Sequence, residues 1–351
     1  MSVKIFYKVL LVVVVAVVVL LFSGVLSAQE QRGNTFERAK EIQEKHTGRL
    51  MAIEGVVGTA VGIDPDNRHE VKVFVERLEV AGVPNKLDEV PVEVVVTGKI
   101  YALKPGEKPT AHRVNPAARF PRPVPIGVST GHPAITAGTI GCRVKDASGK
   151  VYALSNNHIY ANENMAAIGD NVLQPGTYDG GKNPQDAIGT LSDFEYIVFY
   201  NSANPPNPIP TNTIDAAIAL SSTTNLGNAT PSNGYGKPKS TTASAYAGMQ
   251  VQKYGRTTAL TQGKVYATNA TVNVIYDEQQ HRMARFVGQI IITPGAFSAG
   301  GDSGSLVVKK DRNPSENNKP IGLLFAGSQT FTVANPINEV LSTFGVSVDG
   351  E

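Results

Sequence analysis

Three short segments of the chain carry side chains that together could hydrolyse an acyl bond. An apolar stretch leads into His158, Asp215 heads a run of small and apolar residues, and Ser303 lies in the glycine-rich segment 299–304. A serine hydroxyl becomes an effective nucleophile when a neighbouring histidine accepts its proton. A buried carboxylate fixes the tautomer of that histidine and stabilises its charged form. We therefore interpret Ser303 as the nucleophile, His158 as the general base and Asp215 as the group that orients the histidine.

The glycines around Ser303 predict a turn whose backbone N–H groups converge on one point. Such a turn can stabilise the oxyanion of a tetrahedral intermediate. We assign the two donors to Gly301 and Ser303. Asp302, between them, is expected to support this turn and to take no part in the chemistry.

Other residues offer competing interpretations. Asp170 and Asp186 are alternatives for the orienting carboxylate, but the apolar run after Asp215 better predicts a buried strand. The run Asp179-Gly180-Gly181 is interpreted as a solvated turn rather than a metal loop. No cluster of cysteine and histidine has the spacing of zinc ligands. We therefore expect that the reaction requires no metal and no organic cofactor.

The segment Gly301-Asp302-Ser303-Gly304 resembles the nucleophile motif of the chymotrypsin-like (trypsin-like) serine proteases. The order histidine, aspartate, serine along the chain is also that of this family. Residues 255–258 and 263–265 are similar to a segment of bacterial secreted members such as the streptogrisins. The resemblance covers about residues 126–345. It implies two packed six-stranded β-barrels and peptide hydrolysis through an acyl-enzyme.

The resemblance also locates a specificity pocket, which we expect to include Phe297, Ser298, Phe325 and Gly327. Trypsin-like relatives carry an aspartate six residues before the nucleophile, where this chain has Phe297. A basic side chain in such a pocket would lose its hydration without gaining a partner. We therefore expect a small or medium uncharged residue before the scissile bond. Glutamate is a weaker alternative, because Ser298 and Ser328 could donate hydrogen bonds.

The chain departs from the family pattern in ways that concern the geometry of the site. Asn156 and Asn157 replace the small residues that usually precede the histidine, and Phe325 stands where relatives often carry a serine that supports the aspartate. Ile126 loosely resembles the activated N-terminus of trypsin-like enzymes, but Pro125 precedes it. We expect Asp302 to be held by internal partners instead.

The rest of the sequence predicts how these residues are positioned. Residues 126–351 read as short strands separated by turns, in keeping with the 34 glycines and 22 prolines of the chain, and predict an all-β domain. Residues 29–103 predict a small α/β unit, with a helix over 35–51 and strands over 56–63, 71–76 and 90–96. We interpret this unit as an accessory domain or pro-domain, the alternative being a permanent docking domain. Residues 104–125 hold six prolines and predict an extended linker.

Residues 1–28 predict export from the cytosol. Two lysines precede an apolar run that fits a signal peptide or an uncleaved membrane anchor. The remaining chain is expected to be secreted or extracytoplasmic, and to touch a membrane only through this segment if it is uncleaved.

The partners of the chain are expected to be protein or peptide substrates. The net charge of +2 gives no reason to expect a nucleic-acid partner. The single cysteine, Cys142, is interpreted as a buried strand residue.

Two alternatives to a serine endopeptidase stay open: a catalytically weak peptide-binding or scaffolding protein on the protease fold, and an esterase that uses the same three residues.

Overall fold

The computed structural model describes residues 35–104 and 114–351. The expected export segment, residues 1–28, lies outside the described residues, as does part of the proline-rich linker. Within the described part of the chain, no helix is both long and apolar enough to cross a membrane.

The N-terminal unit is a helix packed on a small sheet. The helix covers residues 35–50. The strands are β1 (Val56–Ile63), β2 (His69–Val75), β3 (Lys86–Leu87) and β4 (Val90–Val96). β2 pairs antiparallel with β1 and parallel with β4. Ile42 and Leu50 of the helix pack on Val71 and Val73 of β2, so the unit has an apolar core of its own.

A six-stranded sheet is formed by the first half of the remaining chain together with one strand from near the C-terminus. Its strands are β8 (Cys142–Asp146), β9 (Val151–Ser155), β10 (Asn171–Leu173), β11 (Ala187–Phe194), β14 (Ala217–Leu220) and β21 (Val346–Val348). They lie in the order β10-β11-β14-β9-β8-β21. Beside them, the short strands β6 (Ser129–Thr130) and β7 (Gly138–Thr139) pair with each other. Cys142 is buried in this core, and burial raises the pKa of its thiol to about 12, which keeps it protonated.

The strand pairings of the second half form a ring. The strands are β15 (Gln250–Gly255), β16 (Ala259–Asp277), β17 (Arg282–Thr293), β18 (Leu306–Lys309), β19 (Pro320–Gly327) and β20 (Thr332–Pro336). β15 pairs with β16, β16 with β17, β17 with β20, β20 with β19, β19 with β18, and β18 with β15. Four shorter elements lie outside this ring of strands: β5 (Tyr101–Ala102), β12 (Tyr200–Asn201), β13 (Thr211–Asn212) and the helix α3 (Ile337–Phe344). The mostly β character expected from the sequence is confirmed, and it is consistent with a chymotrypsin-like β fold.

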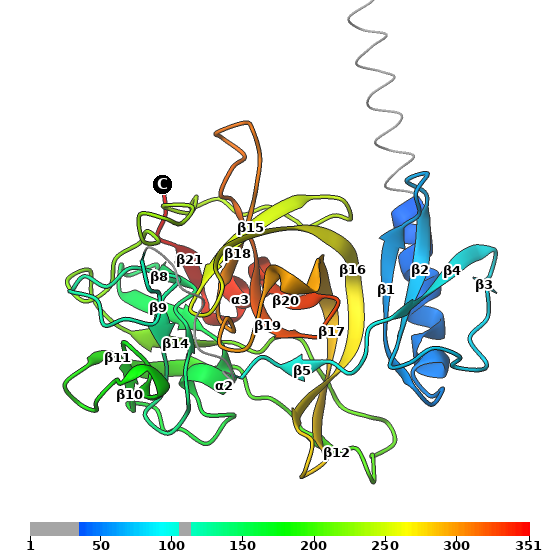
Figure 1. The fold of residues 1–351 in the computed structure, drawn as a ribbon, viewed down its shortest axis with the longest axis horizontal. Coiled ribbons are helices and arrows are strands. Elements are labelled where there is room, and N and C mark those ends of the chain that lie inside the picture. Colours follow the sequence, from blue (N-terminus) through cyan, green and yellow to red (C-terminus); the bar gives the residue numbers. More distant parts are fainter. Residues whose placement is uncertain (1–34, 105–113) are drawn as a thin grey trace, which may run out of the picture.

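The N-terminal unit is joined to the second half through a shared sheet. β1 pairs antiparallel with the long strand β16. Gly58 of β1 permits this approach, because a Cβ there would lie 2.9 Å from the carbonyl oxygen of Thr271. Figure 1 shows the blue N-terminal unit beside the curved β16, and the cyan segment with β5 leading from it toward α2 (Asn157–Tyr160). The unit therefore has its own core but not a separate sheet.

Candidate active site

His158 and Asp215 are brought together by the register of two neighbouring strands. β9 ends at Ser155 and is followed by the short helix α2, which contains His158. Ala217, at the start of β14, pairs with Ser155, so Asp215 lies beside this helix. The Nδ1 atom of His158 is 2.6 Å from Oδ2 of Asp215. Both side chains are buried, as an orienting hydrogen bond requires.

Asp215 is fixed from several directions. The side-chain amide of Asn156 donates to its carbonyl oxygen at 2.7 Å, and its own N–H donates to Oδ1 of Asn335 at 3.1 Å. The backbone N–H of His158 donates to Oδ1 of Asp215 at 3.2 Å. The asparagine that departs from the family pattern thus holds the aspartate in place.

Tyr276 of β16 is a site residue that the sequence reasoning missed. Its hydroxyl donates to Oδ2 of Asp215 at 2.6 Å, and its ring meets that of His158 edge-on, with centroids 6.0 Å apart. Burial, followed by the negative charge of Asp215, raises the pKa of Tyr276 well above its usual value, so the hydroxyl stays a donor. Tyr276 therefore donates to Asp215 the supporting hydrogen bond that Phe325, which stands where relatives often carry a serine, cannot donate.

In any hydrolysis that uses His158 as the base, we expect Tyr276→Phe to lower kcat about 10- to 100-fold with little change in KM. The variant removes one hydrogen bond to a buried carboxylate, and bonds to charged groups contribute about 1.5–3 kcal/mol. Tyr254→Phe is the matched control, because it also deletes a hydroxyl hydrogen bond, to Asn233, which is not one of the candidate catalytic residues. Equal kcat values for the two variants would contradict a positioning role for Tyr276.

The alternative aspartates have other partners. Asp170 lies 3.1 Å from Nε2 of His132, and Asp186 forms an ion pair with Arg119 at 2.6 Å. Asp179 forms an ion pair with the fully buried Arg256 at 2.5 Å. Across residues 35–104 and 114–351, no group of three or more His, Cys, Asp or Glu side chains is placed to hold a metal ion.

The Ser303 turn depends on its glycines. Gly301 and Gly304 have φ angles of 94° and 92°, in the region that favours glycine. A Cβ at Gly304 would also lie 2.2 Å from Oγ of Ser155 and from the carbonyl oxygen of Thr139. The backbone N–H of Thr139 in β7 donates to the carbonyl of Ser303 at 2.8 Å, which ties the turn to the strand pair β6–β7.

Asp302 is held by internal partners, in keeping with the expectation from the sequence. Its carboxylate lies 3.2 Å from Nζ of Lys253, and both side chains are fully buried. It accepts hydrogen bonds from the backbone of Thr257 and Thr258 and from the hydroxyl of Thr258. Burial lowers the pKa of Lys253. These contacts stabilise the turn from inside the protein.

The hydroxyl of Ser303 does not hydrogen-bond to His158 in this conformation. Its single hydrogen has two acceptors within reach instead, the carbonyl oxygens of Leu103 at 3.2 Å and Phe325 at 3.1 Å from Oγ. Nε2 of His158 is buried and has no hydrogen-bond partner among the described residues. Rotation about the Cα–Cβ bond of Ser303 would be needed to redirect the hydroxyl.

The structure places the side chains of Phe297 and Phe325, both expected in the specificity pocket, in two different buried apolar clusters. The N–H of Gly301 donates to the carbonyl oxygen of Leu103 at 2.9 Å, whereas a bond from the N–H of Ser303 stays a prediction. Phe297 is fully buried, and Oγ of Ser298 lies 2.6 Å from Oγ1 of Thr332. The side chain of Phe325 packs on Phe286 with ring centroids 4.7 Å apart.

A groove of about 300 Å³ is lined in part by His158. Ile135, Glu163 and Arg282 also line it. Glu163 is almost fully buried and forms ion pairs with Arg282 and, at 2.7 Å, with Nζ of Lys104. This groove therefore presents an acidic group beside the candidate catalytic histidine.

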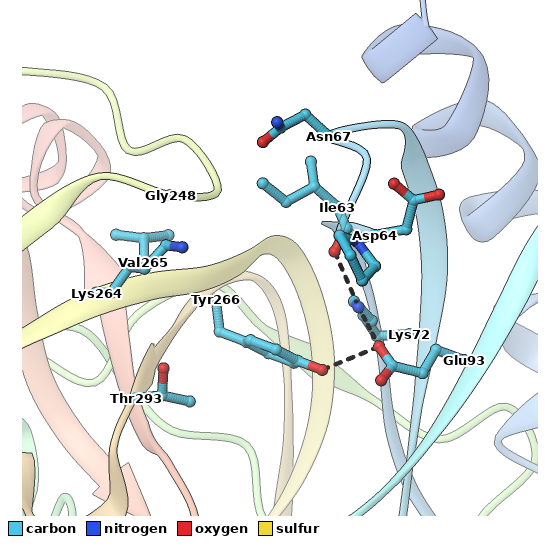
Figure 2. A pocket seen from close by; sticks show the side chains of 11 residues that line it. Ile63, Asp64, Asn67, Lys72, Glu93, Gly248, Lys264, Val265, Tyr266 and Thr293 are labelled. Atoms are coloured by element: carbon cyan, nitrogen blue, oxygen red, sulfur yellow. Dashed lines mark hydrogen bonds and ion pairs between the residues drawn. The ribbon is translucent and has the colours of Figure 1, made fainter.

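A second groove, of about 380 Å³, lies between the N-terminal unit and β16 (Figure 2). Lys72 lines this groove, contacts the carboxylates of Glu70 and Glu93, and lies 4.8 Å from the ring centroid of Tyr266. The hydroxyl of Tyr266 donates to Glu93 at 3.0 Å. Burial opposes the charge of Lys72, but its hydrogen bonds to Glu70 and Glu93 outweigh burial and raise its pKa. None of the three candidate catalytic residues lines this groove, which instead joins the two parts of the chain.

The mostly β fold that holds these three side chains is consistent with a chymotrypsin-like β fold. A family model described as the Nal1 C-terminal domain matches residues 134–335, a range that includes His158, Asp215 and Ser303. The chain belongs to this family. No curated protein matches the sequence.

Several solved structures are similar to the chain at low identity. One, described as a glutamic-acid-specific serine protease that uses a histidine triad in substrate binding, is 22% identical, with a TM-score of 0.46 over 64% of this chain and 100% of that one. The Nocardiopsis protease NAPase is 18% identical, with a TM-score of 0.42 over 64% and 99% of the two chains. The Cellulomonas bogoriensis chymotrypsin is 17% identical, with a TM-score of 0.42 over 65% and 99%.

Proposed function

We propose that this protein is a secreted or membrane-anchored serine endopeptidase. The observation that carries the proposal is the buried 2.6 Å contact between His158 and Asp215 beside a glycine turn that presents Ser303 and the N–H of Gly301. A histidine oriented in this way can act as a base only through Nε2, which is the atom left without a partner in the described residues. We also propose the two-barrel arrangement as the scaffold of this site.

The proposed reaction follows from these positions. Ser303 attacks the substrate carbonyl while His158 takes its proton, and the N–H of Gly301 stabilises the oxyanion. His158 then gives the proton to the leaving amine, which leaves an acyl-enzyme on Ser303. Water hydrolyses this ester through the same base. Asp215, held by Tyr276, stabilises the charged histidine in both steps.

Two other functions use the same features. A peptide-binding or scaffolding protein would need the cleft but not the proton-transfer chemistry, and the oriented His158 favours an enzyme over it. An esterase would use all three residues but would not hydrolyse amides. Peptide hydrolysis by the purified protein separates the proposed function from both.

The proposed substrates carry an uncharged residue of small or medium size before the scissile bond. The expected pocket contains Phe297, Gly327 and neighbouring apolar residues, and none of the expected pocket residues is charged. A buried lysine or arginine side chain would therefore stay unpaired there, which is costly.

We expect cleavage of a proteome-derived peptide library to occur mainly after uncharged residues, with leucine among the best. Cleavage sites identified by mass spectrometry measure this preference, and a Ser303→Ala preparation serves as the blank. Dominant cleavage after lysine or arginine would contradict the assignment of Phe297 to the pocket. No cleavage at all would contradict the peptidase proposal.

A further inference from the structure

The last residues of the N-terminal unit lie in the candidate active site as an added strand. β5 pairs antiparallel with β19, with Ala102 opposite Ala326 and Tyr101 opposite Gly327. The N–H of Leu103 continues this pairing with a hydrogen bond to the carbonyl of Phe325 at 3.2 Å. An extended peptide bound along an exposed strand is held by such main-chain bonds, with its side chains entering pockets alternately.

The carbonyl group of Leu103 occupies the position of a reacting carbonyl. Its oxygen accepts a hydrogen bond from the N–H of Gly301 at 2.9 Å and lies 3.2 Å from Oγ of Ser303. Ser303 and Leu103 are 200 residues apart in the sequence, so this contact is formed by the fold and not by chain proximity. Gly301 thus stabilises the same oxygen that would carry the negative charge after attack by Ser303.

The side chain of Leu103 lies in the expected specificity pocket. It packs against a buried apolar cluster that includes Val265, Ile292 and Phe297. A Cβ added to Gly327 would lie 3.4 and 3.5 Å from its two terminal methyl carbons, so this glycine forms the adjacent wall. A leucine is the kind of uncharged residue that the pocket is expected to accept.

Lys104 enters the groove on the other side of this carbonyl. Its Nζ atom lies 2.7 Å from Glu163 and donates to the carbonyl of Tyr276 at 2.9 Å. The residues on both sides of the Leu103–Lys104 peptide bond therefore have complementary surroundings. His158 lines the same groove as Lys104, so it lies on the side of the leaving amine.

We propose that the protein cleaves its own Leu103–Lys104 bond, and that residues 100–104 block the cleft until it does. This inference rests on the proposed function. Ser303 attacks the Leu103 carbonyl carbon, and its proton passes through His158 to the Lys104 nitrogen as the C–N bond breaks. Water then hydrolyses the Leu103 ester, giving its proton back to Ser303 through His158. The products are a carboxylate at Leu103 and an amine at Lys104, with one water consumed.

The test begins with the full chain and its N-terminal sequence. Intact mass and N-terminal sequencing should show fragments that end at Leu103 and begin at Lys104. Ser303→Ala should stay uncut at this bond, and Leu103→Asp should be cut at least about 100-fold more slowly because the pocket would desolvate a carboxylate. Leu78→Asp, at a leucine side chain that is 76% exposed, is the matched control and should be cut like the wild type.

A peptide of residues 98–107 provides a second measurement that does not depend on the folding of a variant. Wild-type protein should hydrolyse it after Leu103, and the same peptide with aspartate at that position should react at least about 100-fold more slowly. Protein that hydrolyses library peptides but keeps its own bond intact would overturn the inference while leaving the proposed function in place. Cutting of Ser303→Ala at this bond in the absence of wild-type protein would also overturn it, because a foreign protease would then be responsible. Protein that hydrolyses no peptide would overturn both.

Discussion

Ser303→Ala is expected to fold normally and to lose peptidase activity by several orders of magnitude. The alanine keeps the backbone of the turn and removes only the nucleophile. Loss of a triad member leaves the modest rate that substrate binding and oxyanion stabilisation provide by themselves. We expect His158→Ala to be about equally damaging and Asp215→Asn somewhat less. Initial rates on the best library peptide measure all three variants.

Ser221→Ala is the matched control for this series. Its hydroxyl also donates to a main-chain carbonyl, that of Ile188 at 2.7 Å, but it lies at the end of β14 in the first sheet. Near-normal turnover is expected for this control. A Ser303→Ala protein with turnover close to that of Ser221→Ala would show that another residue is the nucleophile.

Lys253→Met is expected to lower the free energy of unfolding by about 3–5 kcal/mol. The variant leaves the fully buried carboxylate of Asp302 without its cation, and breaking one side of a buried ion pair has a cost of this order. Urea unfolding monitored by circular dichroism measures the change. Because Asp302 supports the turn that carries Ser303, turnover should fall as well.

Two further variants identify the cause of that loss. Lys253→Met combined with Asp302→Asn should recover part of the stability, because no buried charge is then left unpaired. Lys99→Met, which removes the cation of an exposed pair with Glu278, should have a much smaller effect. Stability of Lys253→Met equal to that of the wild type would contradict the importance of this pair.

The candidate catalytic residues could be found in the sequence because each carries a local signal. A glycine turn before a buried strand marked Ser303, and an apolar run after a single carboxylate marked Asp215. The same signal separated Asp215 from Asp170 and Asp186, which the structure places with His132 and Arg119. Local patterns of this kind also predicted the helix and the main strands of the N-terminal unit.

The contacts that support the site could not be found in this way. Tyr276 reaches Asp215 across 61 residues of sequence, and no motif surrounds it. Lys253 and Asp302 meet because the fold places β15 beside the turn. The sequence could not predict this pair, because nothing in it distinguishes a buried lysine from an exposed one. The sequence indicated, at Phe325, that a hydrogen bond to Asp215 was missing. It did not indicate that β16 would supply that hydrogen bond.

The junction between the two parts of the chain was also beyond sequence reasoning. The pattern of residues 56–63 predicts a strand but not its partner, and the structure pairs it with β16 as well as β2. Leu103 lies at the end of the unit that the sequence delimited, and only the fold brings it to Gly301. Long-range pairing of this kind depends on tertiary packing rather than on local preference.

Covalent labelling with a fluorophosphonate, followed by mass spectrometry of the labelled peptide, tests the central claim most directly. The reagent reacts with a serine that a neighbouring base has activated. We expect one equivalent on Ser303, and none in the His158→Ala and Ser303→Ala proteins. The Leu103→Asp protein should also be labelled at Ser303. Its residues 100–104 fit the pocket poorly, so the reagent can reach the serine. Label on a different serine would contradict the assignment of Ser303 as the nucleophile. The absence of label from both the wild-type and the Leu103→Asp protein would contradict it as well.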